Sequence, residues 1–171
     1  MYYPVLRGKQ NELLSIREIV EKLGRNNLII PIIEPVKNSE RSIADLNRCL
    51  ESLDSNDLEA VLIVNPRCGG DFDNNKRAIE QIIQTTKQAY NKISYGLWIG
   101  SETSSFELNS FIANIDAPFY LLHHSQYENL DELHALLDGN SNFKKNILDV
   151  NNLSRSYISS FSDNKVKLTD N

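Results

Sequence analysis

The sequence predicts an α/β fold in which repeated βα units form a parallel sheet. Six short apolar runs alternate with longer stretches of helical periodicity. The runs start at residues 3, 28, 61, 95, 119 and 147, so consecutive starts are separated by about one βα unit. Most runs are continuously apolar, as expected for strands that helices cover in a parallel sheet.

The apolar runs give the predicted strands, which are Tyr3–Leu6, Leu28–Ile33, Val61–Val64, Tyr95–Ile99, Phe119–Leu122 and Ile147–Val150. Between them, apolar residues recur at spacings of three and four, which places them on one face of a helix. The five stripes are Leu13, Ile16, Val20 and Leu23; Ile43, Leu46, Leu50 and Leu53; Ile79, Ile82, Ile83 and Thr86; Leu108, Phe111, Ile112 and Ile115; and Leu130, Leu133, Leu136 and Leu137.

Polar residues mark several of the predicted helix ends. Ser42 is a candidate N-cap of the second helix, and Asn74 or Asn75 of the third. Asn129 with Glu132 three residues later has the pattern of a capping box, and Gly139 closes the same helix. We expect a single domain over residues 1–158, followed by a loose polar tail over residues 159–171.

Composition excludes several functional classes. The 171 residues carry a net charge of −5, so the chain has no global attraction for nucleic acid or for anionic lipid, and direct nucleic-acid binding is not expected. No run approaches the length of a membrane span and no basic leader precedes an apolar stretch, so we expect a cytoplasmic protein without membrane contact. Cys49 lies on the apolar side of a predicted helix and Cys68 in a loop, without metal-binding spacing.

Two arrangements of the βα units compete. A closed eight-stranded barrel needs at least about 200 residues, whereas an open doubly wound, flavodoxin-like sheet fits this length. Against the open sheet, the first βα turn reads Leu-Arg-Gly-Lys-Gln-Asn and lacks the glycine-rich nucleotide fingerprints that such sheets use. The chain length therefore favours the open sheet, whereas the absence of a nucleotide fingerprint argues against it.

Polar residues follow every predicted strand, at the edge where both folds place their sites. Glu34 comes directly after an apolar stretch and before Pro35, which restricts its backbone to extended geometry. The strand-end residues are Arg7 and Lys9, Glu34 and Lys37, Asn65 and Arg67, Ser101 and Glu102, His123 and His124, and Asp149. Polar residues also occur at strand ends without any function, because loops meet water there.

The residue types suggest an anion site with an acid or base beside it. Glu34 and His123 are the candidate catalytic residues. The candidate ligand-binding residues are Arg7, Lys9, Lys37, Asn65, Arg67 and Asp149, whose cations suit a phosphate or a carboxylate. Alternatively, Arg7 pairs with Glu34 as an internal salt bridge. No metal or cofactor is expected, because no histidine spacing typical of a metal site is present.

Three segments resemble the phage beta-protein family. They are the N-terminal string from Met1 to Leu13, the string Ile-Ile-Pro-Ile-Ile-Glu-Pro-Val-Lys ending at Lys37, and Ile-Val-Asn-Pro with Gly69 and Gly70. His123-His124 fits the same family. The resemblance points to Arg7, Gly8, Lys9, Glu34, Pro35, Lys37, Asn65, Pro66 and His123, and it implies a chain that continues beyond this one. On that basis we expect a TIM-barrel-like but incomplete sheet.

Two functions follow as hypotheses. The resemblance and the open sheet edge suggest a phage- or defence-associated module that acts through a protein partner or by self-association. The strand-end residues suggest instead an enzyme or binding protein for a small phosphorylated or carboxylated ligand. The sequence alone does not decide whether the chain is an enzyme.

Overall fold

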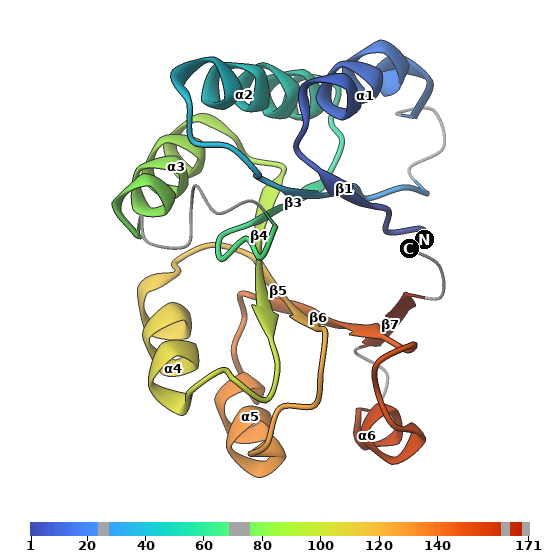
Figure 1. Cartoon of the computed structure of the whole chain (residues 1–171), viewed down its shortest axis with the longest axis vertical. Coiled ribbons are helices and arrows are strands. Elements are labelled where there is room, and N and C mark those ends of the chain that lie inside the picture. The colour runs from blue at the N-terminus through green and yellow to red at the C-terminus, as the bar shows by residue number, and fades with distance from the viewer. Residues whose placement is uncertain (24–27, 69–75, 162–164, 169–171) are drawn as a thin grey trace. The chain divides into compact units, whose positions relative to one another are not determined.

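A computed structural model describes residues 1–23, 28–68, 76–161 and 165–168. It shows an α/β fold of repeated βα units, in which seven strands follow one another in chain order in a parallel sheet (Figure 1). The internal contacts of the chain divide it into two compact units, Met1–Gly96 and Leu97–Asn171, called unit 1 and unit 2 below. The sequence predicted a single domain over residues 1–158.

Unit 1 contains β1 (Val5–Arg7), β2 (Ile32–Glu34), β3 (Ala60–Ile63) and the first part of β4 (Ile93–Ile99), with α1 (Gln10–Leu23), α2 (Glu40–Ser55) and α3 (Lys76–Ala89). β2 pairs in parallel with β1 on one side and with β3 on the other. A flavodoxin-like sheet instead places its first strand between the second and third. The observed order is therefore that of successive strands in a barrel wall.

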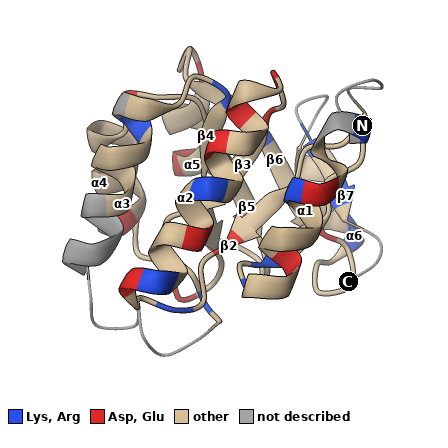
Figure 2. Ribbon diagram, turned by 90° about the horizontal axis from the view of Figure 1, so that it is seen from above, with Lys and Arg blue, Asp and Glu red and all other residues tan. Residues whose placement is uncertain are grey.

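The core of unit 1 lies between its strands and its helices. Ile32 and Ile33 of β2 are fully buried, as are Cys49 and Leu50 of α2. Burial raises the pKa of the Cys49 thiol to about 12, so this cysteine is a core residue at neutral pH, as its position on the apolar stripe indicates. The charged residues of α1 and α2 lie on the outer faces of these helices (Figure 2).

The start of α2 lies three residues before the predicted one. Ser39 is the N-cap, and its side-chain oxygen accepts a hydrogen bond from the backbone N–H of Ser42. Ser42, the predicted cap, is therefore inside the first turn. The predicted caps Asn74 and Asn75 lie outside the described residues.

Unit 2 contains the last part of β4, then β5 (Phe119–His123), β6 (Phe143–Asp149) and β7 (Lys165–Leu168), with α4 (Ser105–Asn114), α5 (Leu130–Leu137) and α6 (Arg155–Ser160). Asn129 caps α5 through a bond from the Glu132 N–H, as predicted. Gly139 has a φ of 72° just after α5, a left-handed conformation that glycine adopts without strain.

The C-terminal segment contains a strand, which corrects the prediction of a loose tail over residues 159–171. β7 pairs in parallel with β6, and Val166 stands opposite Ile147. Its sequence Lys-Val-Lys-Leu alternates polar and apolar residues and buries Leu168. The four-residue strand was missed because two lysines interrupt the continuous apolar pattern that identified the other strands.

Within the described part of the chain, every helix falls short of the length and apolarity that crossing a bilayer requires.

Candidate anion-binding site

The ends of β1 and β2 lie side by side in unit 1. Arg7 and Glu34, the last residues of these strands, are register partners. Gly8 then donates its N–H to the Glu34 carbonyl, and a Cβ on Gly8 would lie only 3.2 Å from that carbonyl oxygen. A side chain at position 8 would therefore crowd the contact between the two strand ends.

The carboxylate of Glu34 is held by backbone groups and not by a cation. Glu34 is only 3% exposed, and its Oε1 accepts hydrogen bonds from the N–H groups of Arg67 at 2.6 Å and Cys68 at 3.3 Å. Arg7 is exposed and makes no ion pair with Glu34 in the described structure. The expected Arg7–Glu34 salt bridge is thus wrong, because the β3–α3 loop supplies N–H donors that satisfy the buried carboxylate instead.

A basic hollow opens beside these strand ends. It has a volume of about 480 Å³ and lies between the β1–α1 loop, the β2–α2 loop and the first turns of α1 and α2. We call it the basic pocket. Its lining residues are Gly8, Lys9, Gln10, Asn11, Leu13, Val36, Lys37, Ser39, Arg41, Ser42 and Asp45.

Positive charge dominates the basic pocket. Among the described residues of its lining, Lys9, Lys37 and Arg41 carry positive charge and Asp45 is the one carboxylate. That carboxylate is already engaged, because its Oδ1 lies 3.1 Å from Nη1 of Arg48. The N-terminal ends of α1 and α2 add partial positive charge to the same hollow. The arrangement suits a small anion.

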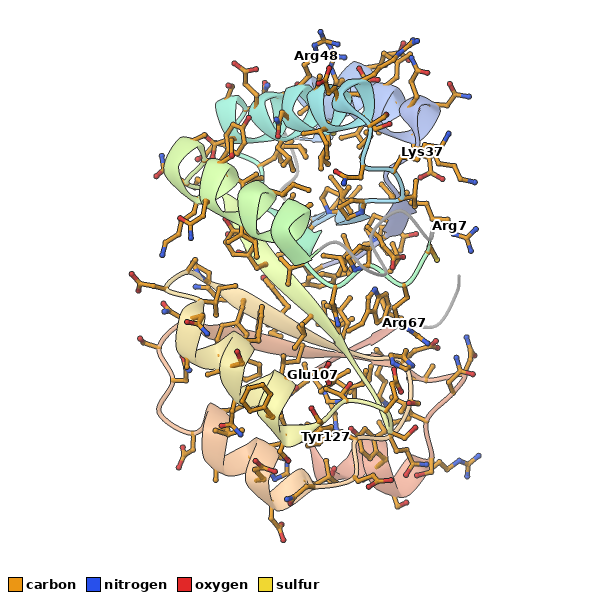
Figure 3. All side chains as sticks on the ribbon, turned by 60° about the vertical axis from the view of Figure 1, so that its left-hand side comes forward. Arg7, Lys37, Arg48, Arg67, Glu107 and Tyr127 are labelled. Atoms are coloured by element: carbon orange, nitrogen blue, oxygen red, sulfur yellow. The ribbon has the colours of Figure 1, made fainter. Side chains whose placement is uncertain are left out.

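The remaining predicted ligand residues of unit 1 lie outside the lining. Arg7 and Arg67 are exposed, and Asn65 is half-buried two residues beyond β3. In Figure 3 the side chains of Arg7, Lys37 and Arg67 project toward the same side of this unit. Among the predicted residues, Lys9 and Lys37 line the basic pocket, whereas Arg7 and Arg67 lie outside its lining. Arg41, which lines the pocket from α2, was missed because it follows its strand by seven residues.

His123, the last residue of β5, lies between the strand and α6. Its side chain contacts Tyr157 of α6 and Phe161, the residue that directly follows this helix. His123 is therefore on the face of β5 that α6 covers. It is fully buried, and its ring packs edge-on against Phe161.

Both ring nitrogens of His123 have hydrogen-bond partners. Nδ1 lies 2.8 Å from the Tyr157 hydroxyl, and Nε2 lies 2.9 Å from Oδ1 of Asn146. Burial lowers the pKa of His123 to about 4, so the imidazole is neutral at pH 7. These surroundings explain His123 as a core residue and do not supply an opening for substrate.

Asp149 forms part of a turn at the end of β6. Its Oδ1 accepts the N–H of Asn151 and its Oδ2 accepts the side-chain amide of Asn152. The strand-end position is as predicted, and the carboxylate orders the turn that leads to α6.

Of the two adjacent histidines, His124 is the one at the strand-end edge. Its Nε2 lies 2.6 Å from Oε1 of Glu102, and its ring packs over Gly100, where a Cβ would lie 2.5 Å from Cε1. The sequence predicted that the two histidines face opposite sides of the sheet, because neighbouring strand residues do. It did not show which histidine takes which side.

Within residues 1–23, 28–68, 76–161 and 165–168, no three His, Cys, Asp or Glu side chains are placed to hold a metal ion together.

Comparisons with family models, with curated proteins and with solved structures found no match. The resemblance to the phage beta-protein family therefore stays a prediction from the quoted segments. Two of its residues, Gly69 and Gly70, lie outside the described residues.

Proposed function

We propose that unit 1 binds a small phosphorylated or carboxylated molecule in the basic pocket. The observation that carries this proposal is the gathering of Lys9, Lys37 and Arg41 in one hollow of a chain whose net charge is −5. The local charge thus opposes the charge of the whole molecule. Such a local excess attracts a small anion, whereas an extended polyanion would meet the acidic remainder of the surface.

The position of the pocket supports the same proposal. It lies at the carboxyl ends of two parallel strands, the edge where α/β proteins place their ligand sites. The first turns of α1 and α2 present backbone N–H groups there, and these groups favour phosphate oxygens or carboxylates. The charge of the basic pocket and its position in the fold therefore both favour an anionic ligand.

Calorimetric titration with inorganic phosphate, ribose 5-phosphate and malate tests the proposal. We expect at least one of these anions to bind, more weakly at higher NaCl concentration. Lys37→Gln should weaken the binding by about tenfold or more, because a charge-assisted hydrogen bond contributes about 1.5–3 kcal/mol.

Lys22→Gln is the matched control, because Lys22 is an exposed lysine in the last turn of α1, at the opposite end of the helix from the pocket. It should leave the affinity unchanged. The proposal would be contradicted if none of the three anions gave a heat of binding. It would also be contradicted if Lys37→Gln and Lys22→Gln lost the same affinity.

We infer a second function, self-association through an apolar groove of unit 1, because of a different observation. This groove of about 400 Å³ lies between α1 and the strand β1, and its lining includes Tyr2, Leu6, Ile16 and Ile19. Tyr2 is 62% exposed and Ile19 is 43% exposed. Exposed apolar side chains gathered beside the strand that begins the sheet order are typical of a docking surface.

A second copy of the chain would cover the exposed apolar side chains of this groove. A phage- or defence-associated partner, as the resemblance implies, would bind at the same surface.

Light scattering over a range of protein concentrations tests self-association. We expect a dimer that Ile19→Lys dissociates, while Arg17→Lys, an exposed change on the same helix, has no effect. A monomer at every concentration would contradict docking of a second copy.

A further inference from the structure

Unit 2 contains a cavity that neither proposed function uses. It has a volume of about 740 Å³ and lies between the end of α5, the loop that follows it, β6 and the end of α6. His134, Asn140, Phe143, Asn146 and Phe161 are among the residues that line it. We call it the α5–α6 cavity.

The wall of the α5–α6 cavity includes a buried amide. Asn146 lies in β6, is only 4% exposed and was not predicted to have a role. Its Oδ1 is already engaged with Nε2 of His123 at 2.9 Å. Within the described residues, Nδ2 of Asn146 makes no hydrogen bond, and Asn146 lines the cavity. This nitrogen is therefore the polar atom that the side chain offers to the cavity.

A chain of hydrogen bonds fixes the orientation of this amide. The Tyr157 hydroxyl oxygen accepts the backbone N–H of Tyr127 at 3.0 Å, so its own proton is directed to Nδ1 of His123, 2.8 Å away. Nδ1 then accepts, and Nε2 carries the ring proton that it donates to Oδ1 of Asn146. Because Oδ1 accepts, the amide cannot flip without losing this bond, and Nδ2 stays a donor.

The charge of the lining differs from that of the basic pocket. Asp138 is the one charged side chain in the described lining of the α5–α6 cavity, and no lysine or arginine joins it. An anion would therefore meet a like charge and no counter-charge. An uncharged ligand fits better.

Aromatic rings supply the rest of the recognition surface. Phe161 packs edge-on against His134, with ring centroids 5.5 Å apart, and Phe143 lines the cavity from the start of β6. Aromatic walls favour a flat ring, and a flat ring that contacts Nδ2 of Asn146 gains a hydrogen bond only when it carries an acceptor.

We propose that the α5–α6 cavity binds an uncharged planar heterocycle, such as a nucleobase, that accepts a hydrogen bond from Nδ2 of Asn146 through a ring nitrogen or a carbonyl oxygen. The His123–Tyr157 pair acts on the ligand through Asn146 and makes no direct contact with it. The pair holds the Asn146 amide in the orientation that directs Nδ2 toward the cavity.

The test is an NMR titration of the full chain with adenosine and uridine, which are uncharged, with indole as a planar control that lacks a ring acceptor. At least one nucleoside should move the side-chain NH₂ signals of Asn146 in a saturable way. Indole should leave these signals in place. If neither nucleoside moves them at millimolar concentration, or if indole moves them equally, the proposal is overturned.

Two variants complete the test. Asn146→Asp keeps an oxygen for His123 but removes the donor, so the affinity for the nucleoside should fall at least tenfold. Ala135→Trp, at an exposed position in the cavity lining, should block binding without disturbing the core, whereas Ala113→Trp, at an exposed position on α4, should not. Unchanged affinity in Asn146→Asp or in Ala135→Trp would overturn the proposal.

Discussion

Glu34 connects the end of β2 to the loop after β3 through two backbone N–H groups. This contact replaces the ion pair that the sequence suggested. The sequence predicted correctly that Glu34 is held, because an apolar run precedes it and Pro35 follows it. It could not predict the donors, because they are backbone N–H groups of a loop 33 residues away. Every residue type except proline has such a group, so the side chains of the loop do not reveal which one binds Glu34.

Glu34→Ala should destabilise the protein by about 1–3 kcal/mol, because it leaves the N–H groups of Arg67 and Cys68 without their buried acceptor. Glu34→Gln should cost less, since its amide oxygen still accepts. Urea denaturation measures both values. Equal stability of Glu34→Ala and the parent protein would show that these hydrogen bonds contribute nothing.

His123 makes the stability of the fold depend on pH. Burial lowers its folded-state pKa to about 4, below the ordinary value of 6.5. The unfolded chain therefore binds the proton more readily, and the stability present above pH 6.5 is lost as the pH falls from 6.5 toward 4. The total loss from this group is about 3 kcal/mol.

Urea denaturation at pH 7 and pH 5 checks this dependence in the parent protein and in His123→Gln, which has no titrating imidazole. The parent should lose more stability than the variant over this interval. The same loss in both proteins would show that other groups cause it.

The helices were easier to predict than the site residues. The apolar stripes placed α1 to α5, because a 3.6-residue period is a local property of the sequence. They missed α6, a helix of six residues that follows the last predicted strand. The basic pocket required knowing which loops meet: Lys9 and Lys37 were included because each closely follows a strand, whereas Arg41 belongs to a helix and was missed. Likewise, the alternation of side chains along a strand predicted that His123 and His124 face opposite sides of the sheet. Only their packing in the structure shows which side each one takes.

The turn between β4 and α4 depends on a glycine. A Cβ on Gly100 would lie 2.2 Å from Oγ of Ser125, the atom that accepts the N–H of Ser101. Gly100→Ala should therefore displace Ser125 and destabilise the protein by about 1–3 kcal/mol, as overpacking does.

Thermal unfolding of Gly100→Ala, Ser125→Ala and the double variant checks this contact. Removing the Ser125 hydroxyl removes the closest clash, so the double variant should lose less stability than the sum of the two single variants. Strict additivity would show that the two positions do not interact.

The strand order of the whole sheet follows the chain, as repeated βα units in a barrel wall do. The spacing of the apolar runs predicted six of the seven strands and their parallel direction. The seventh was missed because β7 is a short alternating segment with two lysines. The division of the contacts into unit 1 and unit 2 falls inside β4, a strand whose seven residues are all buried.

The central claim is that the carboxyl ends of β1 and β2 form an anion site, and an NMR titration of backbone amides with inorganic phosphate tests it most directly. We expect saturable shifts confined to residues 8–11 and 39–42, which line the basic pocket or adjoin its lining, and smaller shifts in Lys37→Gln at equal phosphate. Shifts that are absent, or that are as large around Lys22 at the far end of α1, would contradict the account.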